Sequence, residues 1–218
     1  MNLQLGGLLL VAALFTSSST LTPDECKPLI TPLSLTNFSM MYGRWNYLIG
    51  YIEMEGFNYF ERTQSVWLNI NQSPNPNELI LTQRDRIGGT CVTSILNATF
   101  DGDTFSILFT NASTQFQLLP ACDGCMVKIF NSTSRNVEFL RRLNIMKLLK
   151  GIDFDPKIKE ISFRHLYMMA RGSSLQDSDL ERFKQQASCL GFSGKPGYHY
   201  NPKNEFCAEG EGIKVVIS

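Results

Sequence analysis

Gly43-Arg44-Trp45 begins the stretch GRWNYLIGYIEM, residues 43–54, that decides the fold of this chain. Large side chains recur at every second position from Trp45 through Tyr47 and Ile49 to Tyr51, which is the period of a strand with one buried face. A glycine permits a close backbone approach at the start of such a strand, and a tryptophan buries a large ring. We therefore expect a strand whose odd positions face inward.

The first 20 residues predict a secretory signal peptide. They contain no charged side chain, include the apolar run 8–15 and end in the small residues 17–20. The apolar run is too short for a comfortable membrane span. Residues 21–218 are expected to form a single domain. The formal net charge of zero and the lack of a basic stripe argue against nucleic-acid binding, and no transmembrane segment is predicted.

The cysteines and sequons also favour secretion. Six cysteines are expected to form disulfides in an oxidising compartment, and fifteen pairings are open on the sequence alone. A redox or metal role for Cys122-Asp-Gly-Cys125 is disfavoured, because the pair lies between two predicted strands and because the chain has only two histidines. N-glycosylation sequons begin at five asparagines: Asn37, Asn71, Asn97, Asn111 and Asn131.

Short β-rich runs separated by turn residues predict seven antiparallel strands, and thus a sandwich or an up-and-down barrel. They span 44–54, 62–72, 78–86, 90–100, 104–111, 114–121 and 125–131. An apolar stripe then predicts a basic amphipathic helix over 134–150, which would pack on the barrel or bind a membrane surface. An eighth strand is expected over 159–171, followed by a helix capped by Ser178 and Glu181 and a short strand at 198–200.

Eight strands, a helix and a cysteine-bounded tail resemble the lipocalin plan. The segments 166–170, 187–190 and 204–207 resemble the group of α1-acid glycoprotein and apolipoprotein M. The segments 108–113 and 188–192 resemble the fish plasma members of that group, which bind saxitoxin, tetrodotoxin or tributyltin. The resemblance implies an all-β, eight-stranded up-and-down barrel with a C-terminal helix. The expected helix between strands 7 and 8 is an addition to that plan.

The resemblance also implies roles for individual residues. It pairs Cys26 with Cys189 and Cys91 with Cys207, which leaves Cys122 and Cys125 as a local staple. It stacks Arg171 on Trp45 at the closed end. It favours a ligand cavity over a filled core, and a cationic toxin would meet carboxylates at the end of the first strand or in the loop after it: Glu53, Glu55 and Glu61.

Alternation along the strands, oriented by the sequons, places one set of side chains inside the barrel. Lys128 faces either an anionic ligand group inside or solvent, in which case Val127 and Ile129 face inward. His165 is either a ligand contact or a structural residue. The expected ligand-binding residues are Tyr47, Ile49, Tyr51, Leu68, Ile70, Leu96, Phe105, Phe116, Lys128, His165 and Tyr167.

These observations predict a secreted glycoprotein carrier, of plasma type, for small hydrophobic or amphiphilic molecules, toxins and xenobiotics among them. The alternative is a lipid carrier of apolipoprotein M type, in which the helix 134–150 associates with lipoproteins or membranes. No enzyme activity, cofactor or metal is expected, because every cysteine has a disulfide partner and no catalytic Ser/His/Asp arrangement is recognisable.

Overall fold

The computed structural model describes residues 21–54, 62–109, 112–134 and 160–216. The expected signal peptide and residues 135–150 of the expected basic helix lie outside these ranges. Ser134, which was assigned to that helix, is the last residue of a strand. None of the described helices is both long and apolar enough to cross a membrane.

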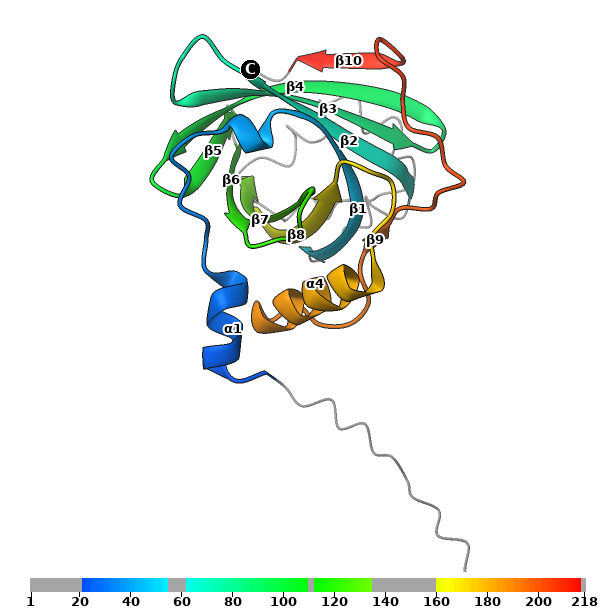
Figure 1. Ribbon diagram of the computed structural model, residues 1–218. Coiled ribbons are helices and arrows are strands. Elements are labelled where there is room, and N and C mark those ends of the chain that lie inside the picture. The colour runs from blue at the N-terminus through cyan, green and yellow to red at the C-terminus, as the bar shows by residue number, and fades with distance from the viewer. Residues whose placement is uncertain (1–20, 55–61, 110–111, 135–159, 217–218) are drawn as a thin grey trace, which may run out of the picture.

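Eight antiparallel strands form a closed barrel, which Figure 1 shows as a ring. Consecutive strands pair with each other, and β1 pairs with β8 to close the meander. This confirms the predicted fold class, with strand bounds close to those expected from the sequence. The strands are β1 (Gly43–Met54), β2 (Thr63–Gln72), β3 (Glu78–Ile87), β4 (Thr90–Asp101), β5 (Thr104–Phe109), β6 (Ala112–Leu119), β7 (Cys125–Ser134) and β8 (Ile161–Ala170).

A bulge in β1 reverses the expected inner and outer faces of its second half. Tyr47 pairs with Met169 and Ile49 with Met168, so Leu48 is an extra residue on the β1 side. Tyr47 faces the barrel interior as predicted. Ile49 and Tyr51 instead belong to an apolar cluster outside the barrel, so their predicted inward placement is wrong.

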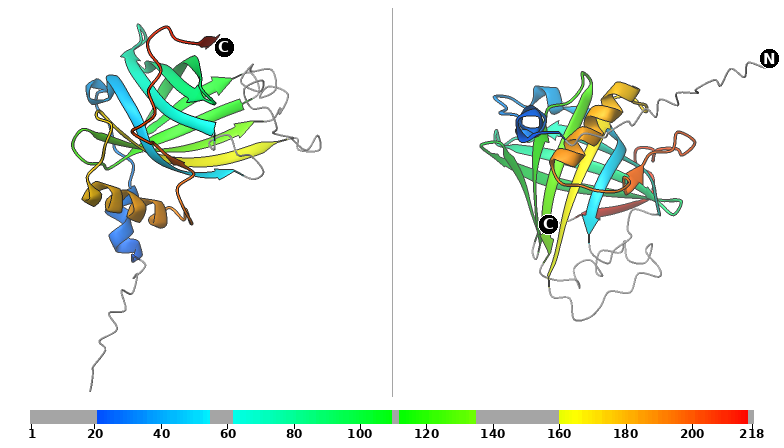
Figure 2. Two further views of the ribbon diagram at one scale, coloured as in Figure 1. Left: turned by 90° about the vertical axis from the view of Figure 1, so that its right-hand side faces the viewer. Right: turned by 90° about the horizontal axis from the view of Figure 1, so that it is seen from below.

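The closed end of the barrel is built around Trp45. The ring is 3 % exposed, and its Nε1 donates to the carbonyl of Met41 at 2.7 Å. Met41 belongs to the 3-10 turn η1 (Ser39–Met41), which lies over this end in Figure 2. The guanidinium of Arg171 lies 3.6 Å from the Trp45 ring centroid, as the resemblance implied. Gly43 has a φ of 89°, which a residue with a side chain rarely adopts.

Two helices lie outside the barrel, and the second of them packs on the face formed by β1, β7 and β8. They are α1 (Pro23–Ile30) and α4 (Asp177–Cys189), joined by the disulfide Cys26–Cys189 (Figure 1). Phe183 and Ala187 of α4 are buried against the outer cluster. The capping box predicted at Ser178 is wrong, because the N-cap of α4 is Gln176, two residues earlier, and its side chain makes no capping hydrogen bond.

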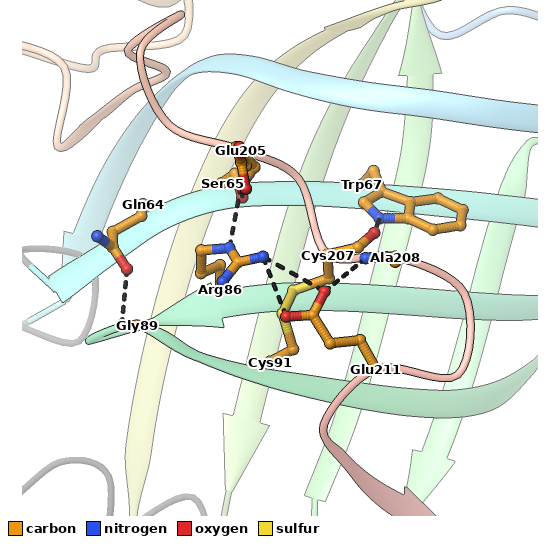
Figure 3. Close-up of polar contacts among 10 residues, drawn as sticks. All are labelled: Gln64, Ser65, Trp67, Arg86, Gly89, Cys91, Glu205, Cys207, Ala208 and Glu211. Atoms are coloured by element: carbon orange, nitrogen blue, oxygen red, sulfur yellow. Dashed lines mark hydrogen bonds and ion pairs between the residues drawn. A yellow bond between two sulfur atoms is a disulfide. The ribbon is translucent and has the colours of Figure 1, made fainter.

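The C-terminal tail crosses the outside of the barrel. β1 pairs with β2 only over Gly43–Asn46, and beyond that point β9 (Tyr198–His199) pairs with β1. The tail then covers the outward ring of Trp67, whose Nε1 donates to the carbonyl of Cys207 (Figure 3). The disulfide Cys91–Cys207 and β10 (Ile213–Val216), parallel to β4, fix its end.

The remaining disulfide and the sequons also agree with the predicted layout. Cys122 and Cys125 form a local disulfide, so all six cysteines are paired as the resemblance implied. The sequon asparagines at 37, 71, 97 and 131 are exposed, as glycosylation requires, and Asn111 lies outside the described residues. Because the tail and the helices lie on the outside of the barrel, its interior is the candidate ligand site.

Candidate functional site

The barrel encloses a cavity of ≈ 210 Å³ above the closed end. A single buried water needs only about 10–15 Å³ of such space, so the cavity has room for a small organic molecule. Its lining is mainly apolar and aromatic with a few polar groups, the usual character of a ligand pocket. The lining residues are Tyr47, Val66, Leu68, Leu81, Gln83, Asp85, Leu96, Ile107, Thr114, Phe116, Lys128, Phe130, Ser132, Phe163, His165, Tyr167 and Tyr198.

The structure brings seven of the eleven predicted ligand-binding residues together on this cavity: Tyr47, Leu68, Leu96, Phe116, Lys128, His165 and Tyr167. Ile70 and Phe105 are buried in the inner core but do not line the cavity. Phe105 stacks on Phe116 with centroids 4.7 Å apart, so it supports the cavity floor from behind. Ile49 and Tyr51 lie outside the barrel because of the bulge at Leu48.

Lys128 is the most unusual residue of the cavity. Its side chain faces inward, as the first of the two alternatives for β7 requires, whereas Val127 and Ile129 face the outer cluster. The residue is 1 % exposed, and its Nζ lies 4.7 Å from the ring centroid of Phe116. Burial lowers the pKa of the ammonium to about 7, because the low-dielectric interior disfavours the charged form.

Asp85 forms a second polar group on the opposite part of the wall. It is 5 % exposed, and burial raises the pKa of its carboxyl group to about 7. Gln83 partly offsets this by donating from Nε2 to both carboxylate oxygens, at 3.0 and 3.1 Å. The Oε1 of Gln83 in turn lies 3.5 Å from the hydroxyl of Tyr47, which donates to it. The amide thus orients the carboxylate within the cavity.

His165 lies between two aromatic rings of the same strand. Its ring stacks on Phe163 at 5.0 Å and meets Tyr167 edge-on at 5.6 Å. Burial lowers the pKa of the imidazole to about 4, so it is neutral near pH 7. The predicted alternatives for His165, ligand contact or structural residue, both remain compatible with a neutral ring on the cavity wall.

The sequence analysis missed Asp85, Gln83 and Tyr198. A signal existed for the first two, since Leu79, Leu81, Gln83, Asp85 and Ile87 continue one alternating row of β3. Tyr198 had no such signal: it enters from the tail beside β1, and its hydroxyl donates to the carbonyl of Tyr47 at 3.4 Å. Of the carboxylates predicted to meet a cationic toxin, Glu53 does not line the cavity. Glu53 pairs with Arg164 at 3.1 Å, and Glu55 and Glu61 lie outside the described residues.

The cavity offers apolar surface, phenols, one buried ammonium and one buried carboxyl group. All six cysteines are in disulfides, so they provide no thiol nucleophile.

Comparison with known proteins gives structural neighbours only. No family model and no curated protein sequence matches this chain. Among solved structures, it is similar to the bovine lipocalin allergen Bos d 2, with a TM-score of 0.49 and 14 % identity over 71 % of this chain and 88 % of the other. The siderocalin Ex-FABP has a TM-score of 0.49 and 11 % identity over 71 % and 89 % of the two chains. The odorant-binding protein OBP1 has a TM-score of 0.49 and 10 % identity over 74 % and 90 %.

Proposed function

We propose that this protein is a lipocalin-type carrier that binds one small, largely apolar molecule inside its barrel. The observation that carries the proposal is the ≈ 210 Å³ cavity, lined mainly by apolar and aromatic side chains inside a barrel whose inner core includes Trp45. Transfer of an apolar ligand from water into such a space supplies the driving force. The polar groups on the wall then orient the ligand.

The stack of Arg171 on Trp45 supports the lipocalin assignment independently of the cavity. It joins the start of β1 to the residue directly after β8, and Arg171 also donates to the carbonyls of Met40 and Arg44, at 3.1 and 2.9 Å. This contact agrees with the role that the sequence resemblance gives to these residues.

A binding assay with a cavity-filling variant tests the proposal. We expect 1-octanol to bind wild-type protein with one-to-one stoichiometry in isothermal titration calorimetry. Leu96→Trp places a large ring in the cavity and should weaken binding by about tenfold or more, since a lost methylene-sized contact alone costs about 0.8 kcal/mol. Leu108→Trp is the matched control, because Leu108 is 74 % exposed on β5.

Absence of saturable binding, or equal affinity of the Leu96→Trp and Leu108→Trp variants, would contradict a carrier function in this cavity. Circular dichroism and thermal unfolding of both variants establish that each is folded. The same calorimetric titration with saxitoxin, tetrodotoxin and tributyltin tests the narrower proposal, based on the sequence resemblance, that toxins or xenobiotics are among the ligands.

We further propose that the carrier is a secreted glycoprotein. Three disulfides and four exposed sequon asparagines support this proposal. Expression of the full chain in secretory cells should deliver it to the medium with glycans that a glycosidase removes. Asn97→Gln should lower the mass of the secreted protein by one glycan, whereas Asn69→Gln, which lies outside any sequon, should leave the glycan mass unchanged. Retention of the protein in the cytosol without glycans would refute secretion.

A further inference from the structure

The buried ammonium of Lys128 has no anionic partner within the described part of the chain. None of the ion pairs among the described residues involves Lys128. The described charge contact of its ammonium is a cation–π contact with the face of the Phe116 ring. A cation–π contact offsets only part of the cost of removing an ammonium from water. An anionic group entering the cavity would provide the missing partner.

The carboxyl group of Asp85 is partnered by a single amide nitrogen. A carboxylate has about four lone-pair sites, and the Nε2 of Gln83 reaches both oxygens with one hydrogen-bonding group. Further acceptor positions therefore remain on the cavity side. A ligand nitrogen that carries hydrogens, above all a cationic one, suits these positions.

The two groups lie on opposite walls of the barrel. Lys128 is on β7 and Asp85 on β3, and four pairing steps separate these strands in either direction around the closed ring. Figure 1 shows β3 and β7 facing each other across the barrel. No ion pair between Lys128 and Asp85 is present among the described residues. A molecule in the cavity would lie between them.

We propose that the cavity selects small zwitterionic amphiphiles, with an anionic group at Lys128, an ammonium group at Asp85 and an apolar linker between them. This inference rests on the proposed carrier function and specifies its ligand class. An uncharged ligand leaves both Lys128 and Asp85 without a charged partner. A ligand with a single charge provides a partner for only one of the two. A zwitterion satisfies both and adds no net charge to the cavity.

Among the described residues, the titratable groups that face the cavity are Tyr47, Asp85, Lys128, His165, Tyr167 and Tyr198. Burial raises the pKa of the Tyr47 and Tyr198 phenols and lowers that of His165 to about 4, so these three are neutral near pH 7. Asp85 and Lys128 have pKa values of about 7, so ligand charge changes their protonation at this pH. Proton exchange on binding thus reports which ends of a ligand are recognised.

Four eight-carbon probes of equal length test the proposal at pH 7: 8-aminooctanoate, octanoate, octylamine and 1-octanol. We expect 8-aminooctanoate to bind wild-type protein about tenfold or more tightly than either singly charged probe, since it alone makes a charge-assisted hydrogen bond at each end. Titrations in buffers of different ionisation enthalpy should show net proton uptake with octanoate, release with octylamine and little exchange with 8-aminooctanoate. A series with 4-aminobutanoate and 6-aminohexanoate determines the preferred separation of the two charges.

Two variants test the contacts of the anionic and the ammonium group separately. Lys128→Met should abolish the advantage of 8-aminooctanoate over octylamine, and Asp85→Asn its advantage over octanoate, while both still bind 1-octanol. Equal affinity of wild type for all four probes would overturn the zwitterion proposal and leave the carrier function standing. Failure of all four probes, 1-octanol included, would instead refute the carrier function itself.

Discussion

The closed end of the barrel and the cavity above it differ in how fully their polar groups are satisfied. At the closed end, the indole nitrogen of Trp45 donates to a carbonyl, and the guanidinium of Arg171 combines a ring contact with two carbonyl hydrogen bonds. In the cavity, Lys128 has a ring contact and Asp85 a single amide donor.

The contrast separates residues that maintain the fold from residues that provide a site. Satisfied polar groups stabilise a buried region, whereas a buried charge without a matching partner lowers stability. Both arrangements occur within one closed sheet. We therefore expect substitutions at the closed end to lower stability, and substitutions of the cavity charges to raise it while they impair ligand selection.

The largest loss of stability is expected for Trp45→Ala. Removal of a buried aromatic ring of this kind costs about 3–5 kcal/mol, and here the ring also holds Arg171 and η1 in place. Urea unfolding followed by circular dichroism measures the change. A loss below about 1 kcal/mol would show that Trp45 does not close the barrel as the structure indicates.

Lys128→Met should act in the opposite direction. Burial lowers the pKa of Lys128 from 10.5 to about 7. Between these values the unfolded chain binds a proton that the folded chain does not, so stability rises with pH through this window, by up to the order of 4 kcal/mol. The variant should lack this rise and should be about 1–4 kcal/mol more stable than wild type at pH 7.

Lys184→Met is the matched control for this experiment. Lys184 lies on α4, is 44 % exposed at its side chain and pairs with Glu181 at 2.7 Å, so its removal should leave the rise between pH 7 and 10 intact. The interpretation of Lys128 as an unpaired buried charge fails if Lys128→Met keeps the wild-type pH profile.

Asp85→Asn should remove the opposite slope at lower pH. Burial raises the pKa of Asp85 from 3.8 to about 7, so in this window the folded chain binds the extra proton and wild-type stability falls as pH rises. The fall is on the order of 4 kcal/mol or less, and the ligand-free protein is then least stable near pH 7 with respect to these two groups. Unfolding of Asp85→Asn between pH 4 and 7 should show a flatter profile, whereas Asp103→Asn, at a fully solvated carboxylate, should retain the fall.

The residues of the closed end could largely be predicted from the sequence, and those of the cavity less fully. Glycine, tryptophan and the alternation of β1 are local signals, and the Arg171 stack followed from a family pattern. The N-terminal helix was missed although Thr22 and Glu25 form a capping box around a proline at the first helical position. These residues alone are sufficient to predict the start of a helix at Pro23.

The cavity was harder, because it depends on contacts between distant segments. The inward row of β3 could have been extended to Gln83 and Asp85, since the alternation continues without interruption. Tyr198 could not have been placed, because its position depends on β9 filling the gap that opens where β1 leaves β2. The bulge at Leu48 was also not predicted. An extra residue in a strand cannot be recognised from the alternation of that strand alone, because it is defined by the register with the partner strand.

The bulge itself can be tested at Gly50, where the smallest effect is expected. Because Leu48 shifts the phase, Gly50 faces inward beneath the ring of Tyr167, and a Cβ there would collide with that ring. Gly50→Ala should therefore cost about 1–3 kcal/mol, as overpacking does in a filled core, and should weaken 1-octanol binding by displacing Tyr167 into the cavity. Gly172→Ala is the control, since a Cβ at that position meets no atom within 4 Å. If Gly50→Ala were as stable as Gly172→Ala, the original phase of β1, with Ile49 and Tyr51 inside, would be the better description.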